Sequence, residues 1–156
     1  MRRRALAISL VAILVLATIP ITADSTSIAG NIDGLELCPQ SICGAAVFVG
    51  DFVGQINGRP KLGAFVGAIT YQALPDPGET SYITGGTWLI WTPLRTFSGV
   101  VLPGGTLTNN GDNTFAVELL MVITKGGSGL VTFNGTLDHN PLLNRRPPTI
   151  RGTNSN

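Results

Sequence analysis

The sequence predicts an all-β protein, a small antiparallel up-and-down β-barrel of about eight strands, preceded by an N-terminal signal helix. After residue 23, no segment keeps an apolar stripe at helical spacing for three turns, whereas alternating stretches rich in Val, Ile, Thr and Phe recur. Short clusters of glycine, proline and asparagine separate these stretches, which favours a meander. Glycine, 20 of 156 residues, also recurs inside the stretches, as expected where strands bend into a closed barrel.

Residues 1–23 have the features of a secretory signal peptide. Arg2, Arg3 and Arg4 precede an apolar segment, and cleavage is expected after Ala23. The apolar run is nearer 15 residues than the roughly 20 that a spanning helix needs, although an uncleaved anchor is the alternative. We therefore expect a secreted or periplasmic protein that has no stable membrane span after cleavage.

The composition excludes two classes of protein. Only 12% of the residues are charged and 44% are hydrophobic, which fits neither a nucleic-acid-binding protein nor a disordered chain. The formal charge of +1 includes three arginines of the signal segment, so the remaining chain is slightly acidic. We expect no nucleic-acid partner.

Three regions follow the signal segment. Residues 24–43 are predicted to form an N-terminal extension with a short disulfide loop, since Cys38 and Cys43 lie close together in an exported chain. Two free thiols are the alternative in a reducing compartment. Residues 44–138 are predicted to form the barrel, and residues 139–156 a basic, proline-containing tail that wraps the barrel or supplies a closing strand near 149–153.

Strands are predicted at 44–57, 62–74, 80–92, 96–102, 105–109, 113–124 and 129–138. The segments between them have turn sequences, such as Asn57-Gly58-Arg59-Pro60 and Pro103-Gly104-Gly105. The loop 109–113 carries oxygen ligands but lacks the glutamate that a calcium loop needs, so we interpret it as a hairpin tip. No metal site and no cofactor are expected.

Four of the six phenylalanines belong to a Phe-x-Gly repeat: Phe48-x-Gly50, Phe65-x-Gly67, Phe97-x-Gly99 and Phe133-x-Gly135. Residues two apart share one face of a strand, so each ring can cover the bare backbone of its glycine. This face is the predicted interior. The residues predicted to line a ligand pocket there are Phe48, Phe65, Trp88, Phe97, Phe115 and Phe133.

The opposite face is unusually apolar for the outside of an antiparallel sheet, with Val47, Val49, Val53, Val66 and Leu120. This pattern predicts a homo-oligomer that associates through the outer face. Coverage by the C-terminal tail is one alternative. The other is an error of one residue in the assigned register, which would exchange the two faces.

The candidates for chemistry are few. His139, the one histidine, follows Asp138, and Tyr71 lies on the presumed inner face. Glu118 and Asp51 lie on the outer face unless the register is shifted. No nucleophile–base pair is visible, so no catalytic residue can be assigned from these weak candidates. Trp88 and Trp91 would lie on opposite faces of one strand, either as ligand contacts or as ordinary packing.

Two segments resemble allene oxide cyclase-like and dirigent-like barrel proteins. They are Gly126-Gly127-Ser128-Gly129 with Phe133-Asn134-Gly135-Thr136-Leu137, and, more loosely, Ile83-Thr84-Gly85-Gly86-Thr87 with Thr96-Phe97-Ser98-Gly99. The resemblance implies an eight-stranded barrel, often oligomeric, that steers reactive intermediates or binds hydrophobic molecules inside the barrel. No catalytic residue of either family is matched.

We therefore expect a protein that binds a small hydrophobic or aromatic ligand, or that associates with itself, without covalent chemistry. One alternative is a cyclase or isomerase that acts through the shape of its pocket. The other is a structural or adhesive envelope protein.

Overall fold

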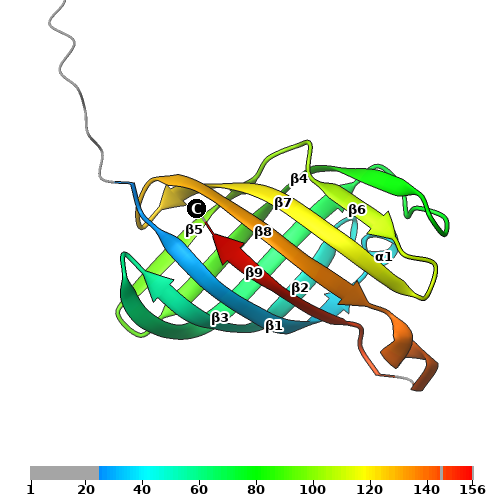
Figure 1. Ribbon diagram of the computed structural model, residues 1–156, viewed down its shortest axis with the longest axis horizontal. Coiled ribbons are helices and arrows are strands. Elements are labelled where there is room, and N and C mark those ends of the chain that lie inside the picture. The colour runs from blue at the N-terminus through cyan, green and yellow to red at the C-terminus, as the bar shows by residue number, and fades with distance from the viewer. Residues whose placement is uncertain (1–24, 145, 156) are drawn as a thin grey trace, which may run out of the picture.

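The computed structural model describes residues 25–144 and 146–155, and the predicted signal helix and its cleavage site after Ala23 lie outside them. The described chain forms a closed antiparallel β-barrel (Figure 1). Its elements are β1 (Ile28–Cys38), α1 (Gln40–Cys43), β2 (Ala46–Ile56), β3 (Arg59–Tyr71), β4 (Thr80–Thr92), β5 (Arg95–Val101), β6 (Thr106–Asn109), β7 (Thr114–Lys125), β8 (Gly129–Asp138), the 3-10 helix η1 (Asn140–Asn144) and β9 (Thr149–Ser155).

The barrel wall has eight strand positions, because β5 and β6 share one. Both pair with β4 and with β7, β5 with one half of each strand and β6 with the other. Each remaining strand pairs with its neighbours in sequence, and β9 pairs with both β8 and β1. The predicted meander of about eight antiparallel strands is therefore confirmed.

The barrel extends beyond the predicted limits of 44–138 at both ends. Residues 28–38, predicted as part of an extension, form β1 and pair with β2 along their whole length. Residues 149–155 form β9, which closes the barrel against β1, as one of the two alternatives for the tail predicts. The C-terminal tail is thus part of the wall and does not cover the outer face.

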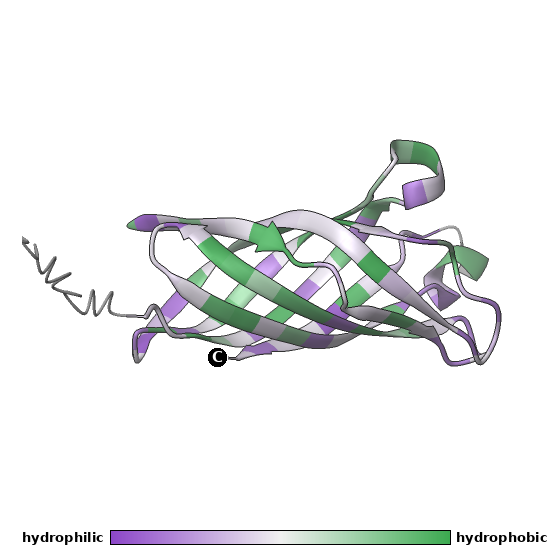
Figure 2. Cartoon of the chain, turned by 90° about the horizontal axis from the view of Figure 1, so that it is seen from above, coloured by the Kyte–Doolittle hydropathy of each residue, from purple (hydrophilic) through white to green (hydrophobic). Residues whose placement is uncertain are grey.

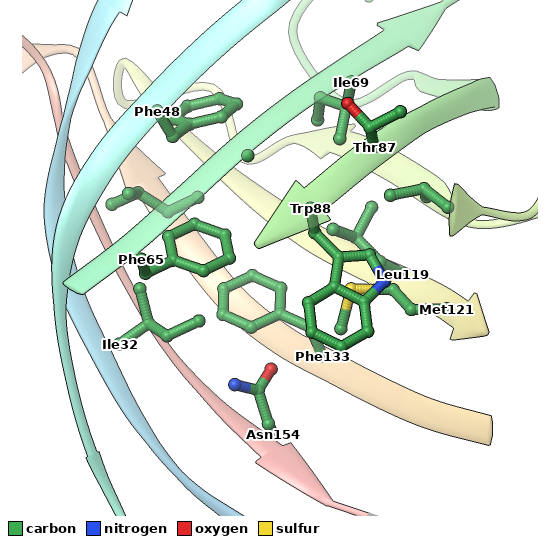
Figure 3. A pocket seen from close by; sticks show the side chains of 13 residues that line it. Ile32, Phe48, Phe65, Ile69, Thr87, Trp88, Leu119, Met121, Phe133 and Asn154 are labelled. Atoms are coloured by element: carbon green, nitrogen blue, oxygen red, sulfur yellow. The ribbon is translucent and has the colours of Figure 1, made fainter. Parts of the chain in front are cut away.

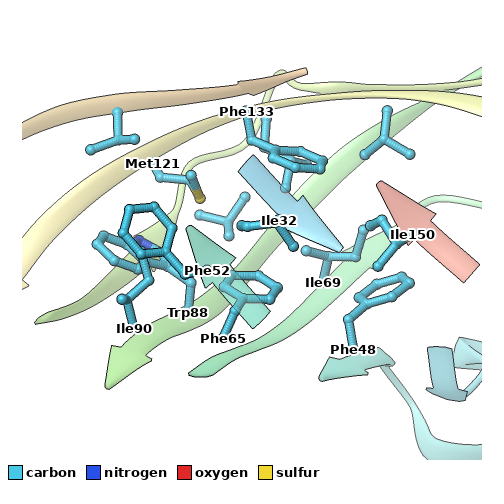
Figure 4. Packing of buried hydrophobic residues seen from close by; sticks show 14 of the residues in the cluster. Ile32, Phe48, Phe52, Phe65, Ile69, Trp88, Ile90, Met121, Phe133 and Ile150 are labelled. Carbon is cyan, nitrogen blue, oxygen red and sulfur yellow. The ribbon is translucent and has the colours of Figure 1, made fainter. Parts of the chain in front are cut away.

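The interior face follows the predicted alternation. Phe48, Phe52 and Ile56 are buried on β2, and the alternate residues from Phe115 to Ile123 are buried on β7. The predicted inner face is therefore confirmed for these two strands. Figure 2 shows hydrophobic and hydrophilic residues alternating along the wall, and Figure 4 shows buried rings meeting across the interior.

Aromatic rings cover glycines, as the Phe-x-Gly pattern predicts, at two of the four repeats. A Cβ atom added to Gly67 would lie 2.8 Å from the Phe65 ring. One added to Gly135 would lie 2.5 Å from the Phe133 ring and equally close to the Arg151 carbonyl oxygen of β9. At Gly50 and Gly99 the nearest obstacle is the backbone of the neighbouring strand. Glycine there permits close approach of two strands, and coverage by the preceding ring is not the limiting contact.

The disulfide between Cys38 and Cys43 is confirmed, with the two Cα atoms 6.1 Å apart. It encloses α1, which connects β1 to β2 at one end of the barrel. This barrel end, where α1, η1 and the loops 72–79 and 110–113 lie, is called the α1 end below (Figure 1). A disulfide is compatible with a protein outside the cytoplasm. No helix in the described part of the chain is long and apolar enough to span a membrane.

Candidate functional site

The aromatic residues predicted to line a ligand pocket are all buried: Phe48, Phe65, Trp88, Phe97, Phe115 and Phe133. Phe48, Phe65, Trp88 and Phe133 surround a cavity at the centre of the barrel (Figure 3). Its volume is about 20 Å³, which is enough for one water molecule. The centre of the barrel is filled by side chains, so in this structure it has no open pocket of the size a drug-like ligand requires.

A buried carboxylate and an imidazole form a polar pair at the α1 end. Glu36 is the last inward-facing residue of β1, and its side chain is only 3% exposed. The His139 ring nitrogen Nε2 donates a hydrogen bond to Glu36 Oε2 at 3.0 Å. The His139 ring also packs on the Phe115 ring, with 5.0 Å between the ring centroids. These contacts therefore hold a carboxylate and an imidazole in one fixed arrangement.

Local structure positions both members of this pair. The Glu36 backbone N–H donates to the carbonyl oxygen of Pro148, which ties β1 to the segment that leads into β9. The His139 backbone N–H donates to the carbonyl oxygen of Asn113 in the hairpin tip between β6 and β7. Because these two hydrogen bonds hold the backbones of Glu36 and His139, the imidazole is fixed where β8 ends.

Besides Glu36 and His139, a third titratable side chain, Tyr71, lies at this end of the barrel. Burial raises the pKa of Tyr71 above its ordinary value of 10.0, and the negative charge of Glu36 raises it further. The end of β3 is fixed by Gln40 of α1, whose side chain accepts a hydrogen bond from the Tyr71 N–H and donates one to the Tyr71 carbonyl oxygen, both at 2.7 Å. Tyr71 therefore stays a neutral phenol over a wider pH range than usual.

Beside the Glu36–His139 pair lies a surface hollow of about 450 Å³, called the end hollow below. Most of its lining is apolar, and Arg146 is one of the lining residues. The residues that line it are Glu36, Leu37, Pro39, His139, Leu142, Arg146, Pro147 and Pro148. Its volume lies within the range of small-molecule sites, and its lining combines apolar groups with a few convergent polar ones.

The structure separates the four candidates for chemistry into two groups. His139 and Tyr71 lie near Glu36 at the α1 end. Glu118 and Asp51 are exposed on the outer face, where Glu118 accepts a hydrogen bond from the Thr106 hydroxyl at 3.3 Å. The structure therefore gives neither outer carboxylate a place in the interior. Within the described ranges, no three His, Cys, Asp or Glu side chains gather as a metal site would require.

Sequence reasoning missed Glu36. The signal was the alternation Ile28, Gly30, Ile32, Gly34, Glu36, which continues one inward-facing row to the carboxylate. Two glycines in that row weaken the local strand pattern, so this alternation is a faint signal for a strand. Trp88 and Trp91 do lie on opposite faces of β4, with Trp88 buried and Trp91 56% exposed.

The fold and the site together define a closed eight-stranded antiparallel barrel with a polar pair at one end. The chain matches no family model, no curated protein and no solved structure. The functional argument therefore rests on the geometry of this chain.

Proposed function

We propose that this protein binds a small, largely apolar molecule that carries one hydrogen-bonding group, without covalent chemistry, and that the end hollow is its site. The observation that supports this proposal is the hollow of about 450 Å³ with apolar walls and the Glu36–His139 pair in its lining. The barrel centre, at about 20 Å³, offers no comparable volume.

The lining suggests how such a ligand is held. Leu37 and Leu142 are each more than half exposed, so a bound apolar group would remove their side chains from water. The His139 Nε2–H is engaged by Glu36, which leaves the other ring nitrogen, Nδ1, to accept a hydrogen bond from the ligand. The carboxylate thus orients the imidazole, and the imidazole orients the ligand.

The proposed location is outside the cytoplasm, as a secreted or periplasmic protein. The signal-like residues 1–23 and the Cys38–Cys43 disulfide support it. Mass spectrometry of protein purified from its native host tests this location and the binding proposal together. We expect a chain that begins at Asp24, an intact disulfide and a retained small molecule.

A direct test uses an aromatic sulfonate dye, anilinonaphthalene sulfonate, as the probe. Because the chain has one histidine, the His139 ring signals in NMR spectra report on the end hollow without assignment ambiguity. We expect the dye to shift these signals. We expect L37S to weaken its affinity about tenfold, since burial of one leucine contributes roughly 1.5 kcal/mol. The matched control is L62S on the outer face, where Leu62 is 68% exposed. An affinity that falls equally in both variants, with unmoved His139 signals, would contradict the proposal.

The second candidate function is an isomerase or cyclase that moves a proton, and the Glu36–His139 geometry is the observation that favours it. A carboxylate that holds an imidazole in one tautomer also stabilises the imidazolium formed when the ring accepts a proton. The probe is 5-nitrobenzisoxazole: His139 Nδ1 would take its carbon-bound proton, the N–O bond would break, and a nitrile phenolate would form. Saturable turnover that H139Q abolishes would support this candidate. Turnover no faster than with H139Q would leave binding as the function.

A further inference from the structure

The barrel end opposite the α1 end carries a surface hollow of about 430 Å³, called the basic hollow below. It lies between the β2–β3 and β4–β5 hairpins, which Figure 1 shows side by side at this end. Three cationic side chains line it, those of Arg59, Lys61 and Arg95. The Arg95 guanidinium carbon lies 5.5 Å from the centroid of the buried Phe97 ring, which also lines the hollow. This cation–π contact holds one positive charge at the hollow.

The three cations form no ion pair with any carboxylate that the structure describes. The two ion pairs of the described chain involve His139 and Arg151 and lie elsewhere. Lys125, at the end of β7, adds a fourth cation to this barrel end. The described carboxylates belong to the α1 end or to the middle of the wall: Glu36, Asp76, Glu79, Asp112 and Asp138 at the former, and Asp33, Asp51 and Glu118 at the latter. The positive charge of this end is therefore uncompensated, and it attracts anions.

Exposed apolar side chains lie beside these cations. Leu94, in the β4–β5 turn, lines the basic hollow and is 86% exposed. Leu62 and Trp91 are 68% and 56% exposed on the outer face of the adjoining strands β3 and β4. Single exposed apolar residues are ordinary, but a leucine at a turn between cations fits the boundary of a lipid bilayer. There the apolar side chain enters the acyl region, the cations meet lipid phosphates, and tryptophan occupies the interface.

The N-terminal apolar segment is joined to the barrel at this same end. β1 begins here, at Ile28, and runs toward the α1 end. Residues 5–17, which precede it in the sequence, are apolar except for Ser9. A membrane that receives this segment would therefore meet the basic hollow before any other part of the barrel.

We propose that this end of the barrel docks on a membrane surface that contains anionic lipids, with lipid phosphates in the basic hollow and Leu94 among the acyl chains. A small soluble anion would satisfy the cations but would leave Leu94 in water, so the exposed leucine favours the membrane. Docking at this end directs the α1 end away from the bilayer, which keeps the end hollow open to solutes. The docking does not depend on a ligand in the end hollow.

The test is cosedimentation of the exported protein with vesicles of phosphatidylcholine alone or mixed with phosphatidylglycerol. We expect binding to the mixed vesicles and much weaker binding to phosphatidylcholine alone. R95Q should weaken binding to the mixed vesicles about fivefold, through loss of one cation near the anionic surface. L94S should weaken it about tenfold, because a leucine no longer leaves water for lipid.

Matched controls carry the same changes away from the basic hollow. Arg151 is an exposed arginine on β9, and Leu143 is 76% exposed in η1 at the α1 end. R151Q and L143S should therefore bind the mixed vesicles as the wild type does.

Three results would overturn the proposal. The first is no binding to the mixed vesicles, and the second is equal binding to both kinds of vesicle, since a retained apolar segment alone would produce it. The third is release of the protein by inorganic phosphate beyond the effect of sodium chloride at equal ionic strength, with L94S bound as tightly as the wild type. That result would assign the basic hollow to a small soluble anion.

Discussion

Glu36 and His139 lie 103 positions apart in the sequence, yet their side chains form a hydrogen bond of 3.0 Å at the α1 end. Their importance depends on burial: Glu36 accepts its bond where water has almost no access, and the surrounding residues are mainly apolar. By contrast, the Arg151–Asp33 ion pair at 3.2 Å has both side chains more than 60% exposed. An exposed pair of that kind contributes little to stability, because solvent screens both charges.

Tyr71 makes stability depend on pH in the alkaline range. Its pKa is raised by burial and by Glu36, so the unfolded chain releases the phenol proton at a lower pH than the folded protein does. The corresponding stability is fully present below the ordinary value of 10.0 and is lost as the pH rises through the raised pKa. Urea unfolding between pH 8 and pH 12 should show this loss in the wild type and a smaller loss in Y71F. Y82F, at the exposed tyrosine, should follow the wild-type curve; if it instead matches Y71F, Tyr71 is not the source.

A substitution at Gly67 tests whether the packing of a ring against a glycine contributes to the stability of the barrel. The nearest atoms to an added Cβ are all in the Phe65 ring, at 2.8 Å and beyond, so the conflict is between two side chains. We expect G67A to lower the free energy of unfolding by about 1–3 kcal/mol through overpacking, measured by urea denaturation. The same change in an F65L background should cost less.

Gly50 supplies the contrast to this prediction. A Cβ there would meet the backbone of Asp33 and Gly34 on β1, which cannot rotate away. G50A should therefore remain destabilising in an F48L background. Equal rescue at both positions would indicate a general effect of the smaller ring.

At the scale of elements, two strands show how pairing partners determine structure. In the pairing of β4 with β3, Thr84 has no partner residue. The inward-facing residues of β4 are therefore odd-numbered before this point, Ser81 and Ile83, and even-numbered after it, Trp88 and Ile90. Gly85 and Gly86, both at φ 155°, allow this bulge. On β1, Gly30 and Gly34 face Gly54 and Gly50 of β2, and the paired glycines let the two strands approach closely.

The disulfide stabilises the connection from β1 to β2. Because it closes a very short loop, the chain-entropy model assigns it about 2 kcal/mol. We expect the double variant C38S/C43S to remain folded and to lose about that much in urea unfolding, since β1 is also paired with β9 along Gly30–Leu35. Complete loss of near-ultraviolet circular dichroism in this variant would show instead that the barrel requires the bond.

At the scale of the whole molecule, the outer face differs around the wall. Over β2, β3 and β4, register partners include Val49 with Val66, Val66 with Leu89, and Ala64 with Trp91. Over β8 and β9 the outward residues are mainly polar, and Asn134 and Thr136 face Thr153 and Arg151. The apolar side is the surface on which we predict self-association.

A charge placed within this apolar side tests the prediction. Val66 is 41% exposed at the middle of β3. We expect wild-type protein to sediment as a dimer or larger assembly at tens of micromolar, and V66K to sediment as a monomer, because a buried unpaired charge opposes association. The control T136K, on the polar side, should sediment like the wild type. A monomeric wild type would remove self-association from the functions considered for this protein.

The sequence by itself determined the all-β class, the inner face of most strands, the turns and the disulfide. These features depend on local rules: alternation with a period of two, the special backbone freedom of glycine, and the proximity of Cys38 to Cys43. Only the tertiary structure decided that residues 28–38 belong to the wall, that the C-terminal tail takes the second of its two predicted roles and closes the barrel, and that Glu36 meets His139. Each of these depends on contacts between segments distant in sequence. A strand rich in glycine such as β1 has weak local preference and is stabilised by its partners on both sides. The small volume of the central cavity is likewise a result of tertiary packing, because it depends on how side chains from opposite strands fit together.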